Sequence, residues 1–489
     1  MARAPGGIDT AFALALSWST VNPWGEPADG LALHPAALAM RAEVFVRLLG
    51  CCPEAASPVA MTLTGEIVRH GFALAEIVGQ NALARSILQL EASAALLGIT
   101  RALPGLPLSG HWRALALQDI ADGIAHLIGD DGAIADPSPH HRLEVVTIAA
   151  ALAAGLKGEA LSATIANRVE AALPGLAGLF DPDGLLPPFG ETPHGEDHAG
   201  WIGRLRAFSA TGRNLVAERR NLPADAPSGS PLPNGMIALR QDAPGRSWSY
   251  FACTYAARGH GHRDASSFVY STESVRWIVE AGGASLVETG PIRHHLTSGE
   301  AHNIARPDGR EPGAGDAWLA GTTTLDGATA YEIGTSVHGP AYAHARIFVV
   351  LSDLSGLAVL DRFAVEDGPV SFEGLLHLAP DVLAAIASPR RAMAQSGRSR
   401  LAFTPLAQVG RVAGLSIVNG RNEGLGAMQG FVSQAPRALA PASVLRYAVS
   451  GTGRICGGML IAADTTAEGR LATLLTGRAL APILGGADS

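Results

Sequence analysis

The sequence carries little charge, and almost none of it comes from lysine. Of 489 residues, 16% are charged and 5% are aromatic, and Lys157 is the only lysine. The formal net charge is −8, which excludes a general electrostatic attraction to nucleic acid or to an anionic membrane. A negatively charged ligand would therefore need a local pocket in which arginine and histidine supply the positive charge.

Cysteines and long apolar runs are also scarce. Two of the four cysteines are adjacent and none has metal-ligand spacing, so the sequence predicts buried or free thiols rather than a disulfide framework. No run of about 18 uninterrupted apolar residues predicts a membrane-spanning helix. The apolar stretch Ala11–Trp18 has no clear cleavage site after it and gives no convincing signal peptide. The cysteines are Cys51, Cys52, Cys253 and Cys456.

The first part of the chain, from about Leu31 to Arg220, has helical spacing. After Asn81, apolar residues recur at steps of four and three, which places them on one helix face. Glycine and proline clusters at 103–105 and 136–139 break this region into helices joined by short loops. Successive helix hairpins are consistent with an (α/α) toroid over residues 1–220. The periodic residues are Leu83, Ile87, Leu90, Ala94 and Leu97.

The second part of the chain has strand spacing. Residues 221–235 contain four prolines and predict an interdomain linker. Beyond them, Val275, Trp277 and Val279 recur every second residue, and short strands are expected to about residue 477. The β-rich runs 346–351 and 357–363 are separated by five residues that indicate a hairpin. Helices first and strands second predict an antiparallel sheet domain over residues 236–489 rather than a βαβ fold.

The most distinctive local feature is the segment 259–264 (GHGHRD). We expect it to open a strand that continues through Tyr270, so that His260, His262 and Asp264 share one face. The flanking glycines allow other groups to approach closely. Three such side chains on one face suit a metal site or an acid–base site. A polar strand face with hydrogen-bonded histidines is the alternative.

The surrounding motifs resemble a known family. The order HGHxDxxSF, a strand ending in Glu280 and two glycines, and then 301–303 (AHN) resembles the sandwich domain of the heparinase II/III-like polysaccharide lyases. The resemblance implies an N-terminal (α/α) toroid followed by a C-terminal antiparallel β-sandwich. It implies that His260 is catalytic and that His262, Glu280 and His302 bind a structural zinc ion. The family usually has Asp at position 280, and the longer Glu side chain would move the metal.

The helical part supplies a second match. Residues 131–142 (DGAIADPSPHHR) resemble the family's DGGHxERSPxYH, whose Tyr is a catalytic acid or base. His141 occupies the position of that Tyr, and Arg142 replaces the following His. Imidazole titrates near neutrality and phenol does not, so His141 could transfer a proton with a different pH dependence. It could equally mark a member that has lost activity, or a helix-start loop with incidental histidines.

A shorter match lies in segment 79–83 (GQNAL), which resembles the family's GNHLL-type helix start. The Asn of that motif contacts the substrate carboxylate, and Asn81 matches it. Ala82 stands where the family has His. Gln80, next to Asn81, is a candidate substrate-binding residue. An exposed polar residue on a helix is the alternative for Asn81.

Two further matches extend the resemblance over both domains. Residues 188–198, which include His194, resemble the family's PxxGDxxD segment and are interpreted as a loop that lines the cleft. His194 is therefore a candidate for substrate binding. Residues 34–41 (HPAALAMR) resemble the family's HPxxxxxR opening. Together the matches span residues 34 to 309.

The resemblance implies β-elimination on a uronate-containing acidic polysaccharide. This reaction must neutralise the carboxylate, remove the proton on C5 and protonate the oxygen that leaves C4. Asn81 and Arg142 are candidates for the first task, because donors aimed at the carboxylate stabilise the developing enolate-like charge. His260 and His141 are candidates for base and acid, in an order that the sequence leaves open. No nucleophile-elbow, P-loop or dinucleotide motif competes with this assignment.

Two other functions remain open on sequence alone. One is a glycan-binding or envelope protein that keeps the fold without catalysis. The other is a metal-dependent hydrolase in which His262, Glu280 and His302 surround an open water site. Family members are mostly periplasmic or secreted, which is what the resemblance implies for this chain. The identity of the polysaccharide and the oligomeric state are not encoded in any motif.

Overall fold

A computed structural model describes most of the chain. The described residues are 7–54, 56–181, 185–194, 235–241, 247–252, 261–283, 290–422, 428–435 and 438–485. The chain divides into two compact units, of which one comprises Met1–Ala135 and Val145–Ala171 and the other Asp136–Glu144 and Ala172–Ser489. The predicted linker 221–235 lies outside the described residues except for its last residue.

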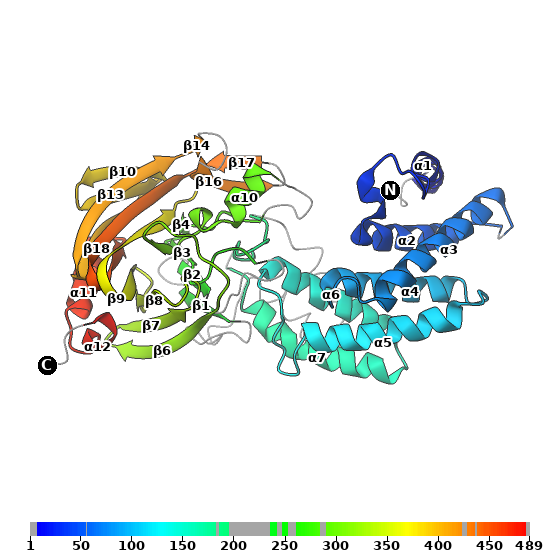
Figure 1. The fold of residues 1–489 in the computed structure, drawn as a ribbon, viewed down its shortest axis with the longest axis horizontal. Helices are drawn as coiled ribbons and strands as arrows, with labels where there is room; N and C mark the ends of the chain where they lie inside the picture. Colours follow the sequence, from blue (N-terminus) through cyan, green and yellow to red (C-terminus); the bar gives the residue numbers. More distant parts are fainter. Residues whose placement is uncertain are drawn as a thin grey trace. The chain divides into compact units, whose positions relative to one another are not determined.

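The elements appear in the predicted order, with helices first and antiparallel strands second (Figure 1). The predicted fold class is therefore confirmed. Among the described helices, none is long and apolar enough to cross a membrane. The helices of the first part are α1 (Gly7–Val21), η1 (Gly30–Leu33), α2 (Pro35–Leu49), α3 (Pro58–Gly79), α4 (Ile87–Ala102), α5 (Ser109–Leu127), α6 (Pro139–Gly155) and α7 (Ala160–Ala177).

Local sequence sets the helix boundaries. Ser57 caps α3 by accepting from Ala60 N, and Ser86 caps α4 by accepting from Gln89 N, which satisfies backbone donors that have no partner inside the helix. The glycine and proline cluster at 103–105 falls between helices, as predicted, and the cluster at 136–139 ends on Pro139, the first residue of α6. The alanine-rich residues 145–155 belong to α6, as expected from the high helix propensity of alanine.

The predicted helix after Asn81 begins later than its apolar spacing indicated. Helix α3 ends at Gly79, and Asn81 has a φ of 47° in the turn that follows. Asn tolerates this left-handed conformation because its short polar side chain bonds locally, here with Oδ1 accepting from the amide of Arg85 at 3.2 Å. Leu83 lies in this turn, and α4 starts at Ile87. Segment 79–83 is therefore a helix end rather than a helix start.

Arg41, from the segment 34–41, has a structural role inside the helical unit. Its Nε donates to His70 Nε2 at 2.9 Å, its Nη2 donates to the Ala32 carbonyl at 2.7 Å, and its guanidinium lies 4.0 Å from the centre of the Trp18 ring. Burial lowers the pKa of His70 to about 4, so at neutral pH this imidazole is uncharged and accepts the bond. The side chain of Arg41 thus ties α2 to α3 and to the preceding segment.

The second part of the chain forms one small and one large antiparallel sheet (Figure 1). The small sheet has the order β1–β2–β3–β4, and the large sheet has the order β10–β11–β12–β18–β9–β8–β7–β6, with β5 beside β9 and β13 beside β18. The strands of the small sheet are β1 (Met236–Gln241), β2 (Ser247–Ala252), β3 (Phe268–Thr272) and β4 (Val275–Ile278). Those of the large sheet are β5 (Ala305–Pro307), β6 (Ala317–Leu325), β7 (Ala328–Thr335), β8 (Ala343–Leu351), β9 (Gly356–His377), β10 (Leu383–Ser388), β11 (Arg391–Ser396), β12 (Ser399–Val409), β13 (Arg411–Asn419) and β18 (Ser443–Ala462). The remaining elements are α10 (Pro291–Thr297), η2 (Gly299–Ala301), β14 (Arg421–Asn422), β15 (Met428–Gln429), β16 (Phe431–Ala435), β17 (Ala438–Pro441), α11 (Thr465–Leu475) and α12 (Ala481–Leu484).

The two sheets pack against each other through buried aromatic residues. The ring of Phe268 in β3 lies 5.2 Å from that of Phe348 in β8, centre to centre. Tyr270 of β3 donates its hydroxyl to the carbonyl of Leu354, in the loop between β8 and β9, at 2.7 Å. The predicted hairpin is confirmed, since β8 and β9 pair directly across this loop. The adjacent residues Trp277 and Ile278 of β4 are both buried, although neighbouring side chains of a strand point to opposite faces. The side chains of β4 therefore do not alternate between core and solvent.

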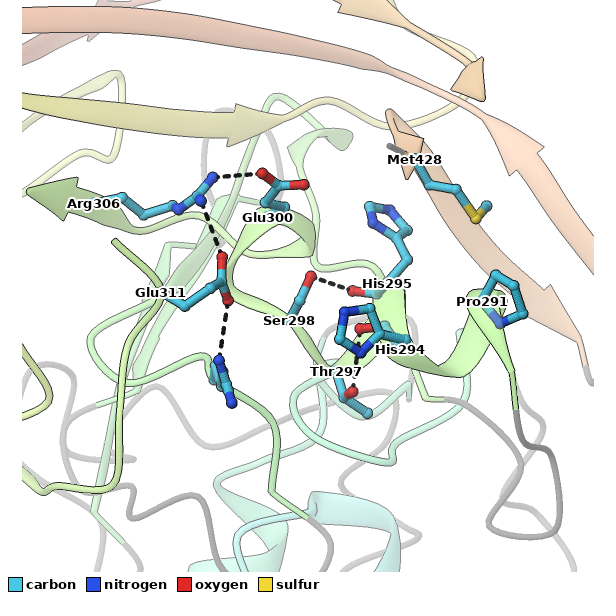
Figure 2. Close-up of a pocket in the computed structure, with 10 residues that line it drawn as sticks. Pro291, His294, His295, Thr297, Ser298, Glu300, Arg306, Glu311 and Met428 are labelled. Carbon is cyan, nitrogen blue, oxygen red and sulfur yellow. Dashed lines mark hydrogen bonds and ion pairs between the residues drawn. The ribbon is translucent and has the colours of Figure 1, made fainter. Parts of the chain in front are cut away.

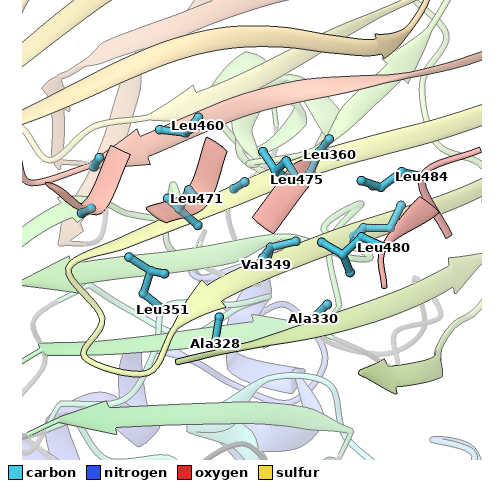
Figure 3. Packing of buried hydrophobic residues seen from close by; sticks show 14 of the residues in the cluster. Ala328, Ala330, Val349, Leu351, Leu360, Leu460, Leu471, Leu475, Leu480 and Leu484 are labelled. Carbon is cyan, nitrogen blue, oxygen red and sulfur yellow. The ribbon is translucent and has the colours of Figure 1, made fainter. Parts of the chain in front are cut away.

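The end of the chain is helical, and the prediction of strands to about residue 477 is wrong. The last strand ends at Ala462, and Asp464 caps α11 by accepting from Ala467 N. Helices α11 and α12 cover an apolar patch of the large sheet (Figure 3). The packed side chains include Leu471, Leu475, Leu480 and Leu484 from the helical end and Ala328, Ala330, Val349, Leu351, Leu360 and Leu460 from the sheet.

Candidate metal and acid–base site

The described part of the segment expected to open a strand, residues 261–264, belongs to a turn instead. Residues 261–267 precede β3, and the turn is closed by a bond from Ser267 N to the Asp264 carbonyl at 2.9 Å. The strand argument for a shared face is therefore wrong. His262 and Asp264 are nevertheless both buried, with exposed fractions of 2% and 0%. His260 lies outside the described residues.

A compact group of ligand-type atoms forms at this turn. Asp264, Glu280 and His302 each place one such atom within 4.8 Å of the others, and all three side chains are buried. The ring of His262 lies 5.4 Å from that of His302, centre to centre. Of the predicted ligands, the structure thus brings Glu280 and His302 into contact and sets His262 beside them. Asp264 joins the group although the family resemblance did not assign it there.

Glu280 is held by neighbours on almost every side. One carboxylate oxygen accepts from the hydroxyl of Ser267, from Asn303 N at 3.2 Å and from Asn303 Nδ2 at 3.0 Å. The other oxygen contacts His302 Nδ1. Burial alone would lower the pKa of His302, but the charge of Glu280 and the bond to it outweigh burial and raise this pKa. The pull of Glu280 on the imidazole is the kind that orients a metal-binding histidine.

Several buried donor and acceptor atoms of the group have no hydrogen-bond partner among the described residues. They are Asp264 Oδ1, His302 Nε2 and both ring nitrogens of His262. Leaving such atoms unpaired costs about 1–3 kcal/mol each, and more for a charged group. A divalent cation would satisfy lone pairs that the surrounding side chains leave unused. The residues present therefore fit a metal ion, and the mixture of imidazole and carboxylate donors suits zinc.

The loop 185–194 packs directly onto this group. Gly190 N donates to Asp264 Oδ2 at 2.9 Å. Glu191, buried to 5% exposure, lies 3.5 Å from His262 Nε2 and pairs with Arg293 at 2.6 Å. Sequence reasoning placed this loop at the cleft but did not single out Glu191. A signal for Glu191 was present in the sequence. Gly190 and Glu191 match the Gly and Asp of the family's PxxGDxxD pattern, so Glu191 stands at an acidic position of that pattern.

The same loop also contacts the segment that carries His141. The Thr192 hydroxyl lies 3.0 Å from that of Ser138 and accepts from His140 N at 3.1 Å. On its other side, the Thr192 carbonyl accepts from Gly283 N at 2.9 Å. One threonine therefore connects the start of α6 to the loop that follows Glu280.

The two predicted residues at the start of α6 are buried. His141 is 8% exposed, and its Nε2 lies 3.9 Å from Glu144 Oε2. Arg142 is 2% exposed and donates from Nε to the carbonyl of Asp136. The guanidinium therefore stabilises the turn that precedes α6, and contact with a substrate stays a prediction for Arg142.

The domain that carries this group matches a known family. Residues 235–441 match the model described as heparinase II/III-like, C-terminal. This region is a heparinase II/III-like C-terminal domain. The family recognised from the motifs is thereby confirmed. No curated protein sequence matches the chain.

Solved structures of heparinases share the fold of nearly the whole chain. Heparinase III matches with a TM-score of 0.72 at 12% identity, over 94% of this chain and 74% of that one. The heparinase III product BT4657 gives 0.68 at 14% identity, over 94% and 76%. Heparan sulfate lyase HepC from Pedobacter heparinus gives 0.64 at 15% identity, over 94% and 74%. At these identities the likeness establishes the fold.

Three other predicted residues are not members of the group Asp264, Glu280 and His302. Gln80 and Asn81 belong to the helical unit, where both are exposed in the turn after α3. His194 belongs to the same unit as the heparinase II/III-like domain. Burial, followed by the charge of Arg276, lowers the pKa of His194 to about 4, so the imidazole is neutral at neutral pH. The substrate contacts of these three residues stay predictions.

A cavity of about 230 Å³ opens next to the group in the heparinase II/III-like domain (Figure 2). Arg306 pairs with Glu300 at 2.9 Å and with Glu311 at 3.1 Å, and Glu311 also lies 3.4 Å from Arg263. Each arginine of the wall is thus already neutralised by a carboxylate. The lining mixes polar and apolar groups, and it is not the free basic pocket that the sequence composition required for an anionic ligand. Its remaining lining residues include His294, His295, Thr297, Ser298 and Met428.

We expect Gly283→Ala to destabilise the packing of the loop on the domain. A Cβ at Gly283 would lie 2.5 Å from the backbone carbonyl group of Glu191, so the loop would have to shift. Such overpacking typically costs about 1–3 kcal/mol. Thermal unfolding should show a lower melting temperature for Gly283→Ala. Gly414→Ala is the matched control, because a methyl group there would meet none of the described residues within 4 Å. Equal melting temperatures of the two variants would contradict the expectation.

Proposed function

We propose that this protein is a polysaccharide lyase that cleaves a uronate-containing acidic polysaccharide by β-elimination. The observation that supports the proposal is the pair of contacts made by loop 185–194. Through Thr192 the loop bonds to the segment of His141, and through Gly190 it bonds to Asp264, four residues after His260. The start of α6, which carries His141, and the turn 261–267, which directly follows His260 in the sequence, are therefore parts of one hydrogen-bonded assembly. The fold shared with heparinase III and with heparan sulfate lyase HepC supports the same reaction class.

In the proposed reaction, one imidazole removes the proton from C5 of the uronate and the other protonates the oxygen that leaves C4. The electron pair of the C5–H bond becomes the C4–C5 double bond as the C4–O bond breaks. His260 and His141 carry these two roles, and general acid–base groups typically contribute about 10²- to 10⁴-fold each. Asn81 and Arg142 are proposed to neutralise the carboxylate. His194, neutral at neutral pH, can offer a hydrogen bond to a sugar hydroxyl without adding charge.

The proposal includes a structural zinc ion, which the family resemblance assigns to His262, Glu280 and His302. A bound zinc would supply a cross-link between the turn 261–267 and the segments that carry the other ligands. The buried nitrogens of His262 and His302 that lack hydrogen-bond partners among the described residues support two of these three ligands. In this role the metal stabilises the wall of the site, while proton transfer remains with the two catalytic imidazoles.

A panel of uronate polymers tests the proposed activity. Glycosaminoglycans, alginate and bacterial exopolysaccharides are incubated with the protein, and the absorbance of the conjugated C=C of an unsaturated uronate product is followed. We expect at least one polymer to give this chromophore, while a neutral glucan, the control, gives none. If reducing ends appear without the chromophore, the reaction is hydrolysis. If neither appears with any uronate polymer, the lyase proposal fails.

Non-catalytic glycan binding is a second candidate, favoured by two observations. Arg142 is buried in the turn before α6, and Ala82 stands where the family has a histidine. Calorimetric titration with the same polymers separates the candidates. Binding heat without product formation would favour the glycan-binding role.

A further inference from the structure

Asp264 is the one carboxylate of the buried group Asp264, Glu280 and His302 whose second oxygen is left unused by the described residues. Its Oδ2 accepts from Gly190 N at 2.9 Å, whereas no described residue donates a hydrogen bond to the buried Oδ1. The side chain is 0% exposed, so water does not compensate Oδ1 from outside. A cation can satisfy a buried carboxylate oxygen that has no hydrogen-bond donor.

The imidazole nitrogens of the two neighbouring histidines also lack hydrogen bonds, although Glu191 Oε1 lies 3.5 Å from His262 Nε2. His302 Nε2 and both ring nitrogens of His262 are buried without hydrogen bonds from the part of the chain that the structure describes. The two histidine rings lie 5.4 Å apart, centre to centre, and His302 shares the 4.8 Å group with Asp264. Two imidazoles and one carboxylate form a donor set found at protein zinc sites.

Glu280 is arranged differently from Asp264. One of its oxygens already accepts from Ser267 Oγ and from Asn303, and the other contacts His302 Nδ1. A carboxylate bonded to one nitrogen of an imidazole whose other nitrogen binds the metal is the usual partner behind a metal ligand. Because Glu is longer by one methylene than the Asp that the family usually has here, its carboxylate reaches the ring of His302.

We propose that Asp264 is a metal ligand, that it binds zinc together with His262 and His302, and that Glu280 positions His302 instead of binding the ion. The bond from Gly190 N then holds the second oxygen of the ligand, as is usual for ligating carboxylates. This assignment puts Asp264 in place of Glu280 in the zinc site that the family resemblance implies, and it stands or falls independently of the lyase reaction.

Zinc affinity measured on the full chain tests the proposal. Wild type, Asp264→Asn, Glu280→Gln and the control Asp316→Asn are stripped with a chelator and titrated with zinc alone against a competing indicator. Asp316 lies outside the buried group and is accessible to solvent. We expect about one zinc per chain in the wild type and in the control. Glu280→Gln should weaken binding about 10- to 100-fold, as loss of a positioning partner does, and Asp264→Asn should weaken it further.

Two outcomes would overturn the proposal. One is a wild type that binds no zinc, and the other is a loss in Asp264→Asn no larger than that in Glu280→Gln. Melting temperatures with zinc and with chelator separate ligation from packing. Asp264→Asn should melt where the chelated wild type melts and should not respond to zinc. A melting temperature far below that of the chelated wild type would assign Asp264 a packing role instead.

Discussion

Replacing His260 by Ala is expected to lower the rate of polysaccharide cleavage about 10²- to 10⁴-fold, the range that a single acid or base contributes. The expected loss is in kcat, because the imidazole acts when the C5–H and C4–O bonds break rather than when the sugar binds. Removing the imidazole should leave the fold intact. The measurement is the initial rate of chromophore formation at saturating polymer, with circular dichroism as the check on folding.

Two comparisons make this result specific. His111→Ala removes an exposed histidine of α5 and should retain the wild-type rate. His141→Ala should lose activity on the same scale as His260→Ala. If the two imidazoles act as one acid–base pair, the double variant should be little worse than either single variant. A rate near that of the wild type in His260→Ala would remove this residue from the mechanism.

Replacing Asp361 by Asn is expected to destabilise the sheet unit by about 3–5 kcal/mol, because it leaves a buried arginine without its counter-charge. Arg346 donates to Asp361 from Nε at 2.9 Å and from Nη2 at 3.0 Å, and His344 Nε2 lies 2.8 Å from the same carboxylate. Arg346 is 1% exposed and Asp361 is 0% exposed. Urea unfolding followed by circular dichroism should give the lower stability.

The contribution of Asp361 also depends on pH in a defined direction. Burial alone would raise its pKa, but the charge of Arg346 and the bond to His344 outweigh burial and lower the pKa to about 2. An unfolded Asp titrates near about 3.9. The stabilisation is therefore fully present above that value and is lost as the pH falls toward 2 and below. In Asp361→Asn, this component of acid destabilisation should be absent.

The partly exposed pair Arg446–Glu373 is the matched control for the buried pair. The atoms of this pair lie 2.6 Å apart, but the side chains are 32% and 25% exposed. Water already solvates such groups, so Glu373→Gln should cost no more than about 1 kcal/mol. A loss in Asp361→Asn as small as that in Glu373→Gln would contradict the importance of the buried pair.

The sequence predicted the large-scale order of the chain because the period of apolar residues differs between helices and strands. It also predicted the hairpin between β8 and β9, since turn residues separate two β-rich runs. That hairpin fixes the register in which Arg346 lies directly opposite Asp361. The buried ion pair depends on this register, because a shift of one residue would place a different residue opposite Arg346. The helical end was missed although Asp464, a helix-capping residue, precedes apolar residues at helical spacing.

The residue types of the candidate site could be predicted from the sequence, but the backbone conformation that places them could not. His262, Glu280 and His302 were selected by motif, and two of the three contact each other. The backbone around them was not predictable, because Ser266 adopts a φ of 66° inside a buried turn and breaks the expected strand. The period of apolar residues in a sequence indicates which side chains are buried. The backbone conformation of a turn depends instead on tertiary contacts, such as the hydrogen bond from Gly190 N to Asp264.

Strand β18 comes late in the sequence but lies in the middle of the large sheet. Its 20 residues pair with the 22-residue β9 on one side and with β12 and β13 on the other. During synthesis, β9 therefore leaves the ribosome long before its neighbour exists, with a full row of backbone donors and acceptors unsatisfied along one edge. Such an edge invites association with other nascent chains. We therefore expect the edge of β9 to be protected from such association only once β18 has been synthesised and has paired with it.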